Sequence, residues 1–375
     1  MENMENMENM ENMENMEHKG YMQMALDLAE KGMHSSMPNP RVGCIVVHNS
    51  QVVGQGWHSK TGEDHAEVMA LSQAGHKAKG ATAYITLEPC NHYGKTPPCT
   101  DSLISAGVET VIYAMDDPNP EVSGKSTGIL KAAGVKVIHG VLHQKSKDLN
   151  IGFVKRMESG LPYIRSKIAS SIDGKTALLN GTSQWISSEK SREDVQSWRA
   201  RSCALLTSIE TVLSDDPFLN VRIDGFDDLD QPMRVVLDSQ LRIDSHYKIL
   251  RLPGQKIIYT LKAQHNDPEI QNMIKTAEEY DGHISLEYLF RDLAKREVNE
   301  VMIECGGVLN GALLKQEFID ELIVYIAPCI LGNKARNMFS LPVLSEMSDR
   351  YNFDSTQVDQ IDHDVRVILR KSNYI

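Results

Sequence analysis

Three residues of metal-binding type, His65, Cys90 and Cys99, constrain this chain of 375 residues more than any other feature. One imidazole and two thiolates fill three tetrahedral positions of a zinc ion and leave the fourth open to water. An open position is typical of a catalytic zinc rather than a purely structural one. Glu67, two residues after the histidine, is then predicted to carry protons instead of binding the metal.

The order of these residues, His-x-Glu followed by Pro-Cys and a second cysteine, matches the signature of zinc nucleobase deaminases. The spacing differs, because the eight residues 91–98 separate the cysteines here. A lone His-x-Glu is usually a solvated surface or a core histidine, but the full set favours a metal site. Zinc lowers the pKa of bound water to about 7. Glu67 would take the water proton and return it to the departing amine, which typically contributes about 10²–10⁴-fold.

The first seventeen residues repeat Met-Glu-Asn without apolar periodicity, so we interpret 1–17 as an engineered leader and expect it to be disordered. The leader supplies six glutamates and no basic residue, so the formal net charge of -12 becomes about -6 for the remainder. An acidic chain is a poor candidate for binding nucleic acid, because that affinity depends on Lys and Arg at the phosphates.

No apolar run approaches the roughly 18 residues of a membrane span, and no secretory signal is visible, so we expect a cytoplasmic protein. The cysteines are scattered along the chain, which argues against a disulfide framework. Two are assigned to the metal and four are expected to be small buried hydrophobic residues. The six are Cys44, Cys90, Cys99, Cys203, Cys305 and Cys329.

The first half has the pattern of a layered α/β domain, with a hairpin over 42–57 and a helix starting at His65, for which Asp64 is a candidate N-cap. Cys99 is expected to open a helix, whose dipole stabilises a thiolate there by about 0.3–1 kcal/mol. Further strands are predicted over 83–87, 110–115 and 135–139, and further helices over 21–30, 126–133 and 148–157.

The turn cluster Ser159-Gly160-Leu161-Pro162 predicts a boundary between domains 18–160 and 161–375. Strands are expected over 163–170, 204–207, 234–238, 256–260, 300–304, 321–326 and 365–370, with helices over 188–201, 268–279, 286–295 and 309–316. Glu304 to Gly307 reads as a strand end and glycine turn before a helix, which suits phosphate binding by backbone amides. Gly124-Lys125-Ser126 lacks the first glycine of a phosphate loop, so we interpret it as a surface turn.

Several motifs together carry a family resemblance. They are Met37-Pro38-Asn39-Pro40, His65-Ala66-Glu67, Thr86 to Cys90, Gly94 to Cys99, Asp117-Pro118-Asn119-Pro120, Lys167-Ile168-Ala169, Ser183 to Ile186, Thr211 to Pro217 and Glu304 to Leu314. From about His18 onward the chain resembles the bifunctional deaminase/reductase family of riboflavin biosynthesis. The eight-residue cysteine spacing resembles this family rather than cytidine or tRNA deaminases.

This resemblance implies a cytidine-deaminase-like three-layer α/β/α domain followed by a dihydrofolate-reductase-like α/β domain. It implies zinc-dependent deamination of 2,5-diamino-6-(5-phosphoribosylamino)pyrimidin-4(3H)-one. It also implies reduction of the ribosyl group of 5-amino-6-(5-phosphoribosylamino)uracil to ribityl by NADPH. We therefore expect pyrimidine ribose-phosphate substrates, a homo-oligomer, and no binding to nucleic acid or membranes.

The resemblance also assigns residues. In the deaminase, Asn39 and His92 would meet the substrate, although a solvated loop histidine is an equal alternative for His92. The NADPH side would comprise Ala169, Trp185, Thr211, Asp215, Ser239, Gly306, Gly307, Val308, Leu309, Asn310, Gly311 and Ala312. The reductase substrate would meet Lys167, Ser183, Arg199, Leu219, Arg222 and Glu304. Arg199 and Arg222 suit a phosphate clamp, with a plain surface cation as the alternative. Asn91, Ser126 and Cys305 depart from the residues usual in the family.

Two other functions stay open at this point. A nucleic-acid or nucleoside deaminase with an accessory reductase-like domain predicts salt-sensitive binding to single strands. A non-catalytic zinc-stabilised interaction module predicts a closed site with four protein ligands, whereas the sequence offers three ligands and an adjacent glutamate.

Overall fold

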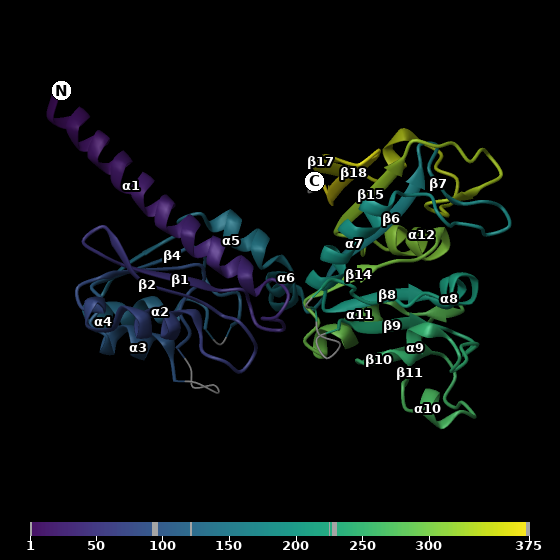
Figure 1. Cartoon of the computed structure of the whole chain (residues 1–375), viewed down its shortest axis with the longest axis horizontal. Coiled ribbons are helices and arrows are strands. Elements are labelled where there is room, and N and C mark those ends of the chain that lie inside the picture. Colours follow the sequence, from purple (N-terminus) through teal and green to yellow (C-terminus); the bar gives the residue numbers. More distant parts are fainter. Residues whose placement is uncertain (1, 92–96, 121, 225, 227–230, 373–375) are drawn as a thin grey trace. The chain divides into compact units, whose positions relative to one another are not determined.

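The computed structural model describes residues 2–91, 97–120, 122–224, 226 and 231–372, with side chains from residue 15 onward. His92, which we assign to the deaminase substrate, lies outside the described residues. The chain divides into two compact units, Met1–Gly160 and Leu161–Ile375 (Figure 1). Each unit contains its own sheet and its own buried core, and each is described separately below.

The first unit is built on a five-stranded sheet in the order β2-β1-β3-β4-β5. β1 pairs antiparallel with β2 and β3, whereas β3, β4 and β5 run parallel. The strands are β1 Gly43–His48, β2 Gln51–Trp57, β3 Thr82–Ile85, β4 Thr110–Tyr113 and β5 Lys136–His139. The helices are α1 Glu2–Ala29, α2 Ala66–Ala74, α3 Cys99–Ser105, α4 Lys125–Ala132, α5 His143–Leu149 and α6 Ile151–Ser159, with 3-10 turns at Glu30–Gly32 and Gly75–Ala78.

Strand β1 shows why helices cover both faces of this sheet. Successive side chains of a strand point to opposite faces, and those of β1 are apolar on both. Cys44 and Val46 pack in a cluster with α2, α3 and α4, while Ile45 and Val47 pack in a cluster with α1. The unit therefore has the three layers α/β/α that the sequence predicts.

Helix α2 lies unusually close to strand β2, and two glycines permit this approach. A Cβ atom on Gly54 would lie 2.1 Å from the carbonyl oxygen of Ala70, and one on Gly56 would lie 2.4 Å from that of Ala66. Any larger residue would push the helix away, because these contacts are with backbone atoms. The start of α2, which carries the candidate site, is thus fixed against the sheet.

The expectation of a disordered leader differs from the structure. Helix α1 runs without a break from Glu2 to Ala29, so the leader continues the helix that the sequence predicts over 21–30. Met and Glu are good helix formers, and a helix anchored at one end by packing extends at little cost. The anchor is the buried end of α1, where Met22, Ala25 and Leu28 pack on the sheet.

The second unit has a nine-stranded sheet in the order β11-β10-β9-β8-β14-β6-β15-β18-β17, parallel from β11 to β15 and antiparallel at β18 and β17. Its strands are β6 Tyr163–Ser171, β8 Ala204–Ser208, β9 Met233–Leu237, β10 Lys256–Thr260, β11 Ile274–Thr276, β14 Glu300–Ile303, β15 Glu321–Ala327, β17 Phe353–Ile361 and β18 Asp364–Lys371. Two small ribbons pair β7 Lys175–Ala177 with β16 Arg336–Asn337 and β12 Glu279–Tyr280 with β13 His283–Ile284.

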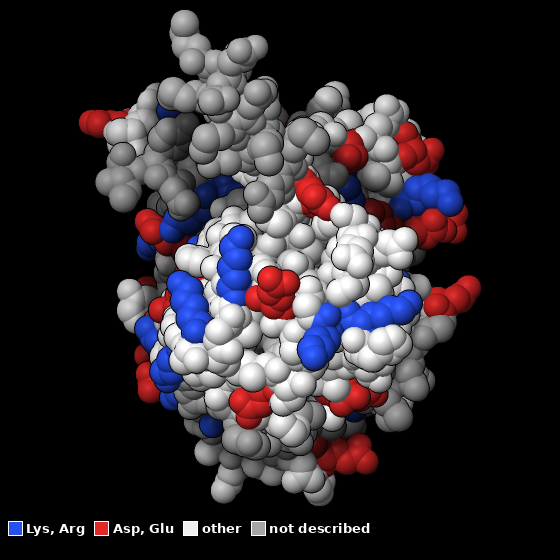
Figure 2. Space-filling model, turned by 90° about the vertical axis from the view of Figure 1, so that its left-hand side faces the viewer, with Lys and Arg blue, Asp and Glu red and all other residues white. Residues whose placement is uncertain are grey.

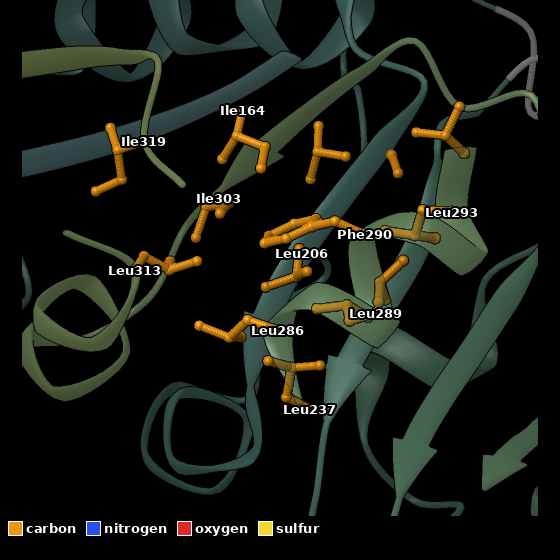
Figure 3. Close-up of a cluster of buried hydrophobic side chains, with 14 of the residues drawn as sticks. Ile164, Leu206, Leu237, Leu286, Leu289, Phe290, Leu293, Ile303, Leu313 and Ile319 are labelled. Carbon is orange, nitrogen blue, oxygen red and sulfur yellow. The ribbon is translucent and has the colours of Figure 1, made fainter. Parts of the chain in front are cut away.

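Helices cover both faces of this sheet as well. They are α7 Glu189–Arg201, α8 Ile209–Asp215, α9 Lys248–Arg251, α10 Pro268–Gln271, α11 Leu286–Lys295 and α12 Gly307–Lys315, with a 3-10 turn at Met347–Asp349. On one face, α11 and α12 pack on strands β6, β8, β9 and β14 (Figure 3). On the other, α7, α8 and α9 pack on the same central strands.

Several features of the second unit differ from the prediction, which lacks the short elements α8, α9, β7, β12, β13 and β16. The helix predicted over 268–279 is wrong, since α10 ends at Gln271 and Ile274–Thr276 form strand β11 beside β10. Pairing with β10 and burial of this segment outweigh its local helical pattern. Strand β17 was not predicted, because it is a mostly exposed edge strand without apolar alternation.

Surface charge is mixed. On the face drawn in Figure 2, Lys and Arg lie among Asp and Glu, and neither sign gathers into one continuous patch. Within the described part of the chain, no helix is long and apolar enough to span a membrane.

Phe290, a fully buried residue of α11, provides a test of the core in Figure 3. We expect Phe290→Ala to lower the free energy of unfolding by about 3–5 kcal/mol, because it removes buried apolar area and leaves a cavity. The midpoint of urea unfolding measures this change. Val343→Ala is the control, since Val343 is 93% exposed and its truncation should change stability by less than about 0.5 kcal/mol. Equal midpoints for the two variants would contradict the packing described.

Candidate active sites

The three predicted metal ligands meet in the first unit. His65 immediately precedes α2, Cys99 is the first residue of α3, and Cys90 lies in the loop between β3 and α3. The Nδ1 atom of His65 lies 3.3 Å from Cys99 Sγ and 3.6 Å from Cys90 Sγ, and all three ligand atoms lie within 4.8 Å of one another. These separations fit a tetrahedral zinc ion at about 2.0–2.3 Å from each ligand.

The thiol of Cys90 is held in the form that binds a metal. The neighbouring Cys99 side chain contributes most, and the imidazole of His65 and the backbone N–H of Cys99 add to it, so that the pKa of Cys90 falls to about 4 despite burial. The N–H of Cys99 donates to Cys90 Sγ over 3.3 Å. Hydrogen bonding to Cys90 and then burial raise the pKa of the Cys99 thiol, so without a metal the two sulfurs share one proton. One imidazole and two sulfur atoms around one point are nevertheless the donor set of a zinc site.

Glu67 lies in the first turn of α2 and is 3% exposed. Burial raises the pKa of its carboxyl to about 7. A group with a pKa near neutrality both accepts and releases protons readily, as the predicted proton carrier must. Asp64, in contrast, is not the N-cap of α2. His65 occupies that position without a side-chain cap bond, and the predicted cap is wrong by one residue.

Asn39, the predicted substrate residue, is held by a histidine that the sequence analysis did not use. His58 is 3% exposed, and burial lowers its pKa. Its Nδ1 lies 3.2 Å from the carbonyl oxygen of Asp64, and its Nε2 lies 3.1 Å from Asn39 Nδ2. A neutral imidazole that donates to the carbonyl therefore accepts from the amide of Asn39. This leaves Asn39 Oδ1 as the acceptor available to a substrate.

In the second unit, Glu304 follows β14 directly and binds Arg199 of α7. Arg199 donates to Glu304 from Nε over 2.6 Å and from Nη2 over 3.0 Å, and its Nη1 donates to the carbonyl oxygen of Asn220 over 2.9 Å. Burial opposes ionisation of Glu304, but Arg199 and then Lys167 and Arg222 outweigh it and lower the pKa of this carboxyl. Arg199 thus positions Glu304, and Arg222 Nη1 donates to Asn220 Oδ1 over 2.8 Å.

Lys167 and Arg222 belong to the same group of charges. Burial lowers the pKa of the Lys167 amine, and Arg199 and Arg192 lower it further against the effect of Glu304. Burial, followed by Arg199, also lowers the pKa of Arg222. Leu219, three residues before Arg222, is buried. Among the described residues, no hydrogen bond links Ser183 to these charged side chains.

The residues predicted to bind the cofactor gather where parallel strands end. Thr211 and Asp215 lie on α8 after β8, and Ser239 follows β9, the neighbour of β8. Ala169 lies toward the end of β6. Nucleotides bind at the carboxyl edge of such sheets, so this placement fits a dinucleotide. Trp185 is 69% exposed, and the guanidinium of Arg192 lies 4.3 Å from its ring.

The glycines at the start of α12 differ in how much space surrounds them. A Cβ on Gly306 would meet nothing within 4 Å, so its backbone is open to a ligand. A Cβ on Gly307 or Gly311 would lie 2.3 or 2.0 Å from a carbonyl oxygen of segment 337–340, so these glycines allow close packing. Asn310 is buried, and its side chain binds Ser166. Val308 is 77% exposed, whereas Leu309 and Ala312 pack against the core.

Comparisons with known proteins match the first unit to a zinc-binding deaminase region and the second unit to a RibD domain. Residues 15–115 match the cytidine and deoxycytidylate deaminase zinc-binding region, and residues 162–367 match the RibD C-terminal domain. The riboflavin biosynthesis protein RibD of Escherichia coli K12 is 45% identical over 357 residues, covering 92% of this chain and 97% of that protein. The chain belongs to the RibD family.

Solved structures of RibD proteins agree over the whole length. Acinetobacter baumannii RibD in its form 2 is 41% identical with a TM-score of 0.88, covering 96% of this chain and 100% of that one. A Thermotoga maritima deaminase/reductase is 32% identical with a TM-score of 0.87 and the same coverage. The chain is a bifunctional enzyme of riboflavin biosynthesis, with a zinc-dependent deaminase unit and a reductase unit that takes a nicotinamide cofactor. The predicted fold and enzyme class are confirmed.

Glu67→Gln tests the proton carrier separately from the metal. We expect this variant to keep its zinc, since Glu67 is not among the three ligands, and to lose about 10²–10⁴-fold in deamination. Reduction should be unchanged. Zinc content and the two activities, each assayed on its own substrate, measure these effects. Glu63→Gln, at an exposed position four residues upstream, is the control. Deamination at the parent rate by Glu67→Gln would show that another group moves the proton.

Proposed function

We propose that the first unit removes the 2-amino group of 2,5-diamino-6-(5-phosphoribosylamino)pyrimidin-4(3H)-one. The second unit then reduces the ribosyl group of 5-amino-6-(5-phosphoribosylamino)uracil to ribityl with NADPH. The observation that carries this proposal is the set of His65, Cys90 and Cys99 around one point with buried Glu67 beside them. The Thermotoga maritima relative is described as acting on these two compounds, which supports the same order here.

In the deamination, His65, Cys90 and Cys99 hold zinc, which when bound lowers the pKa of water to about 7. Glu67 takes a proton from the water and delivers it to the departing amine, so that ammonia leaves and the water oxygen becomes the new carbonyl. Asn39, held by His58, accepts a hydrogen bond from a ring N–H through its Oδ1. These residues orient the pyrimidine and move the proton.

In the reduction, Thr211, Asp215 and Ser239 would hold the nicotinamide cofactor, which when bound would supply a hydride to C1′ of the ribosyl group. The bond between C1′ and the ring oxygen breaks, and that oxygen needs a proton. Lys167 is the donor we assign, because its lowered pKa makes the ammonium a better acid and Glu304 keeps it charged. Lys167, Arg192, Arg199 and Arg222 outnumber the one carboxylate of Glu304, which favours binding of the substrate phosphate.

The cofactor and the remaining partners complete the proposal. We assign NADPH rather than NADH, and a homo-oligomer that acts on small pyrimidine ribose phosphates without nucleic acid. The mixed charge in Figure 2 supports the last point, since nucleic-acid binding depends on clustered Lys and Arg.

Incubation of the zinc-loaded protein with the diaminopyrimidine substrate tests the whole proposal. Mass spectrometry should show loss of ammonia without any cofactor, and ribityl product only when NADPH is added. A parallel reaction with NADH should be slower. Absence of ammonia loss from the zinc-loaded protein would rule out the proposed deaminase substrate. Reduction before deamination would reverse the proposed order.

Arg199→Lys tests the pairing with Glu304. A lysine cannot donate two parallel hydrogen bonds, so Glu304 should lose its fixed position. We expect kcat/KM of the reduction to fall about 10–100-fold, while deamination is unchanged. Arg291→Lys, on the exposed side of α11, is the matched control. An Arg199→Lys enzyme that reduces as fast as the parent would show that this pair does not position the substrate.

A further inference from the structure

The residue two positions before Cys90 is a buried carboxylate with an unusual set of partners. Glu88 is 2% exposed, and its own N–H donates to the carbonyl oxygen of Met115 over 2.9 Å. Its Oε2 accepts from the backbone N–H groups of Asp117 and Gly124 over 3.2 and 3.0 Å. Its Oε1 accepts from the N–H of Ser126 over 3.1 Å. The carboxylate thus ties the metal loop to the segment before α4.

The residues on either side of Cys90 are tied to the same segment. Ser126 is fully buried, and its Oγ donates to the carbonyl oxygen of Pro89 over 2.6 Å. The amide of Asn91 donates to Ser126 Oγ over 3.3 Å and to the carbonyl oxygen of Val122 over 3.2 Å. Gly124 and Lys125 are exposed, as the interpretation of a surface turn predicts, but Ser126 points inward from the first turn of α4 and supports the metal loop.

Burial of Glu88 has a cost that its partners must offset. An ionised carboxylate out of water is destabilising by several kcal/mol unless it is paired or hydrogen-bonded. Among the residues that the structure describes, no Lys or Arg forms an ion pair with it. Three backbone N–H groups, two of them at the start of α4, bind it instead, and the dipole of that helix favours a negative charge there.

The opposite side of Cys90 is held by α3. The N–H of Thr100 donates to the carbonyl oxygen of Cys90 over 3.2 Å, and the N–H of Cys99 donates to its Sγ over 3.3 Å. Cys90 therefore lies between the starts of two helices. It is hydrogen-bonded directly to α3, and its neighbours Glu88, Pro89 and Asn91 are hydrogen-bonded to the chain at the start of α4. The position of Cys90 is thus determined by hydrogen bonds to backbone groups as well as by side-chain packing.

We propose that Glu88, Ser126 and Asn91 are positioning residues that fix Cys90 for zinc. None of them binds the metal, but together they hold the peptide that carries one of its ligands. Outer partners of metal ligands typically contribute 10–100-fold to metal affinity. We expect loss of the Glu88 carboxylate to lower zinc affinity by about the same 10–100-fold. Loss of the Ser126 or Asn91 side chain should lower it less, because each of these makes fewer hydrogen bonds to this part of the chain.

The test measures zinc rather than activity. Full-length zinc-loaded protein is titrated with a chelator to obtain the zinc affinity, and zinc release is followed with a chromogenic dye. Glu88→Gln should weaken zinc binding about 10–100-fold, because its amide group meets N–H donors where the second carboxylate oxygen stood. Glu109→Gln, at an exposed carboxylate of the same unit, should leave it unchanged.

Two further variants keep the proposal testable if Glu88→Gln does not fold. Ser126→Ala and Asn91→Ser should each release zinc several-fold faster than the parent. In the double variant, the increase in release rate should be smaller than the product of the two single increases, because the two side chains are hydrogen-bonded to each other. Circular dichroism and the reductase activity should match the parent in all folded variants. Parent-like zinc release from Ser126→Ala and Asn91→Ser would overturn the proposal. The outcome is independent of the substrate assignment, because no substrate is used.

Discussion

In each unit a largely buried carboxylate lies just after a central strand, beside the residues of the candidate site. Taking an ionised carboxylate out of water costs several kcal/mol, so its partners must be held in place for the fold to form. In the first unit, Glu88 follows β3 by three residues, and the partners of its carboxylate among the described residues are backbone N–H groups. In the second, Glu304 follows β14 directly and is bound by the guanidinium of Arg199. The two carboxylates are thus held by different kinds of donor, backbone N–H groups for Glu88 and a guanidinium for Glu304.

Backbone N–H groups neutralise Glu88 without bringing a cation near Cys90, whose thiolate must remain available to zinc. Around Glu304, in contrast, Arg199, Lys167 and Arg222 supply guanidinium and ammonium groups that lower the pKa of the carboxyl. The central sheet of the second unit follows the same principle, since buried Arg165 on β6 pairs with Glu300 and Glu321. Arg165, Glu300 and Glu321 are thus all matched by partners on neighbouring strands.

The sequence predicted those elements whose pattern is local. His65, Glu67, Cys90 and Cys99 could be assigned because metal chemistry restricts residue type and order, and the strand at 256–260 because its apolar run is bounded by polar residues. Segment 268–279 was mispredicted because a neighbouring strand, not its own pattern, decides its structure. The roles of Ser126 and His58 could not be predicted, since each depends on a contact across the fold: Pro89 for Ser126, and Asn39 for His58.

The long interval between the two cysteines follows from this geometry. Cys99 is placed by the start of α3, and Cys90 by its bonds to α3 and to the segment before α4, so neither sulfur depends on the length of chain that joins them. A deaminase with two residues between its cysteines can therefore share this metal geometry with one that has eight. This explains how a departure from the general spacing leaves the zinc chemistry intact while it distinguishes this family from other deaminases.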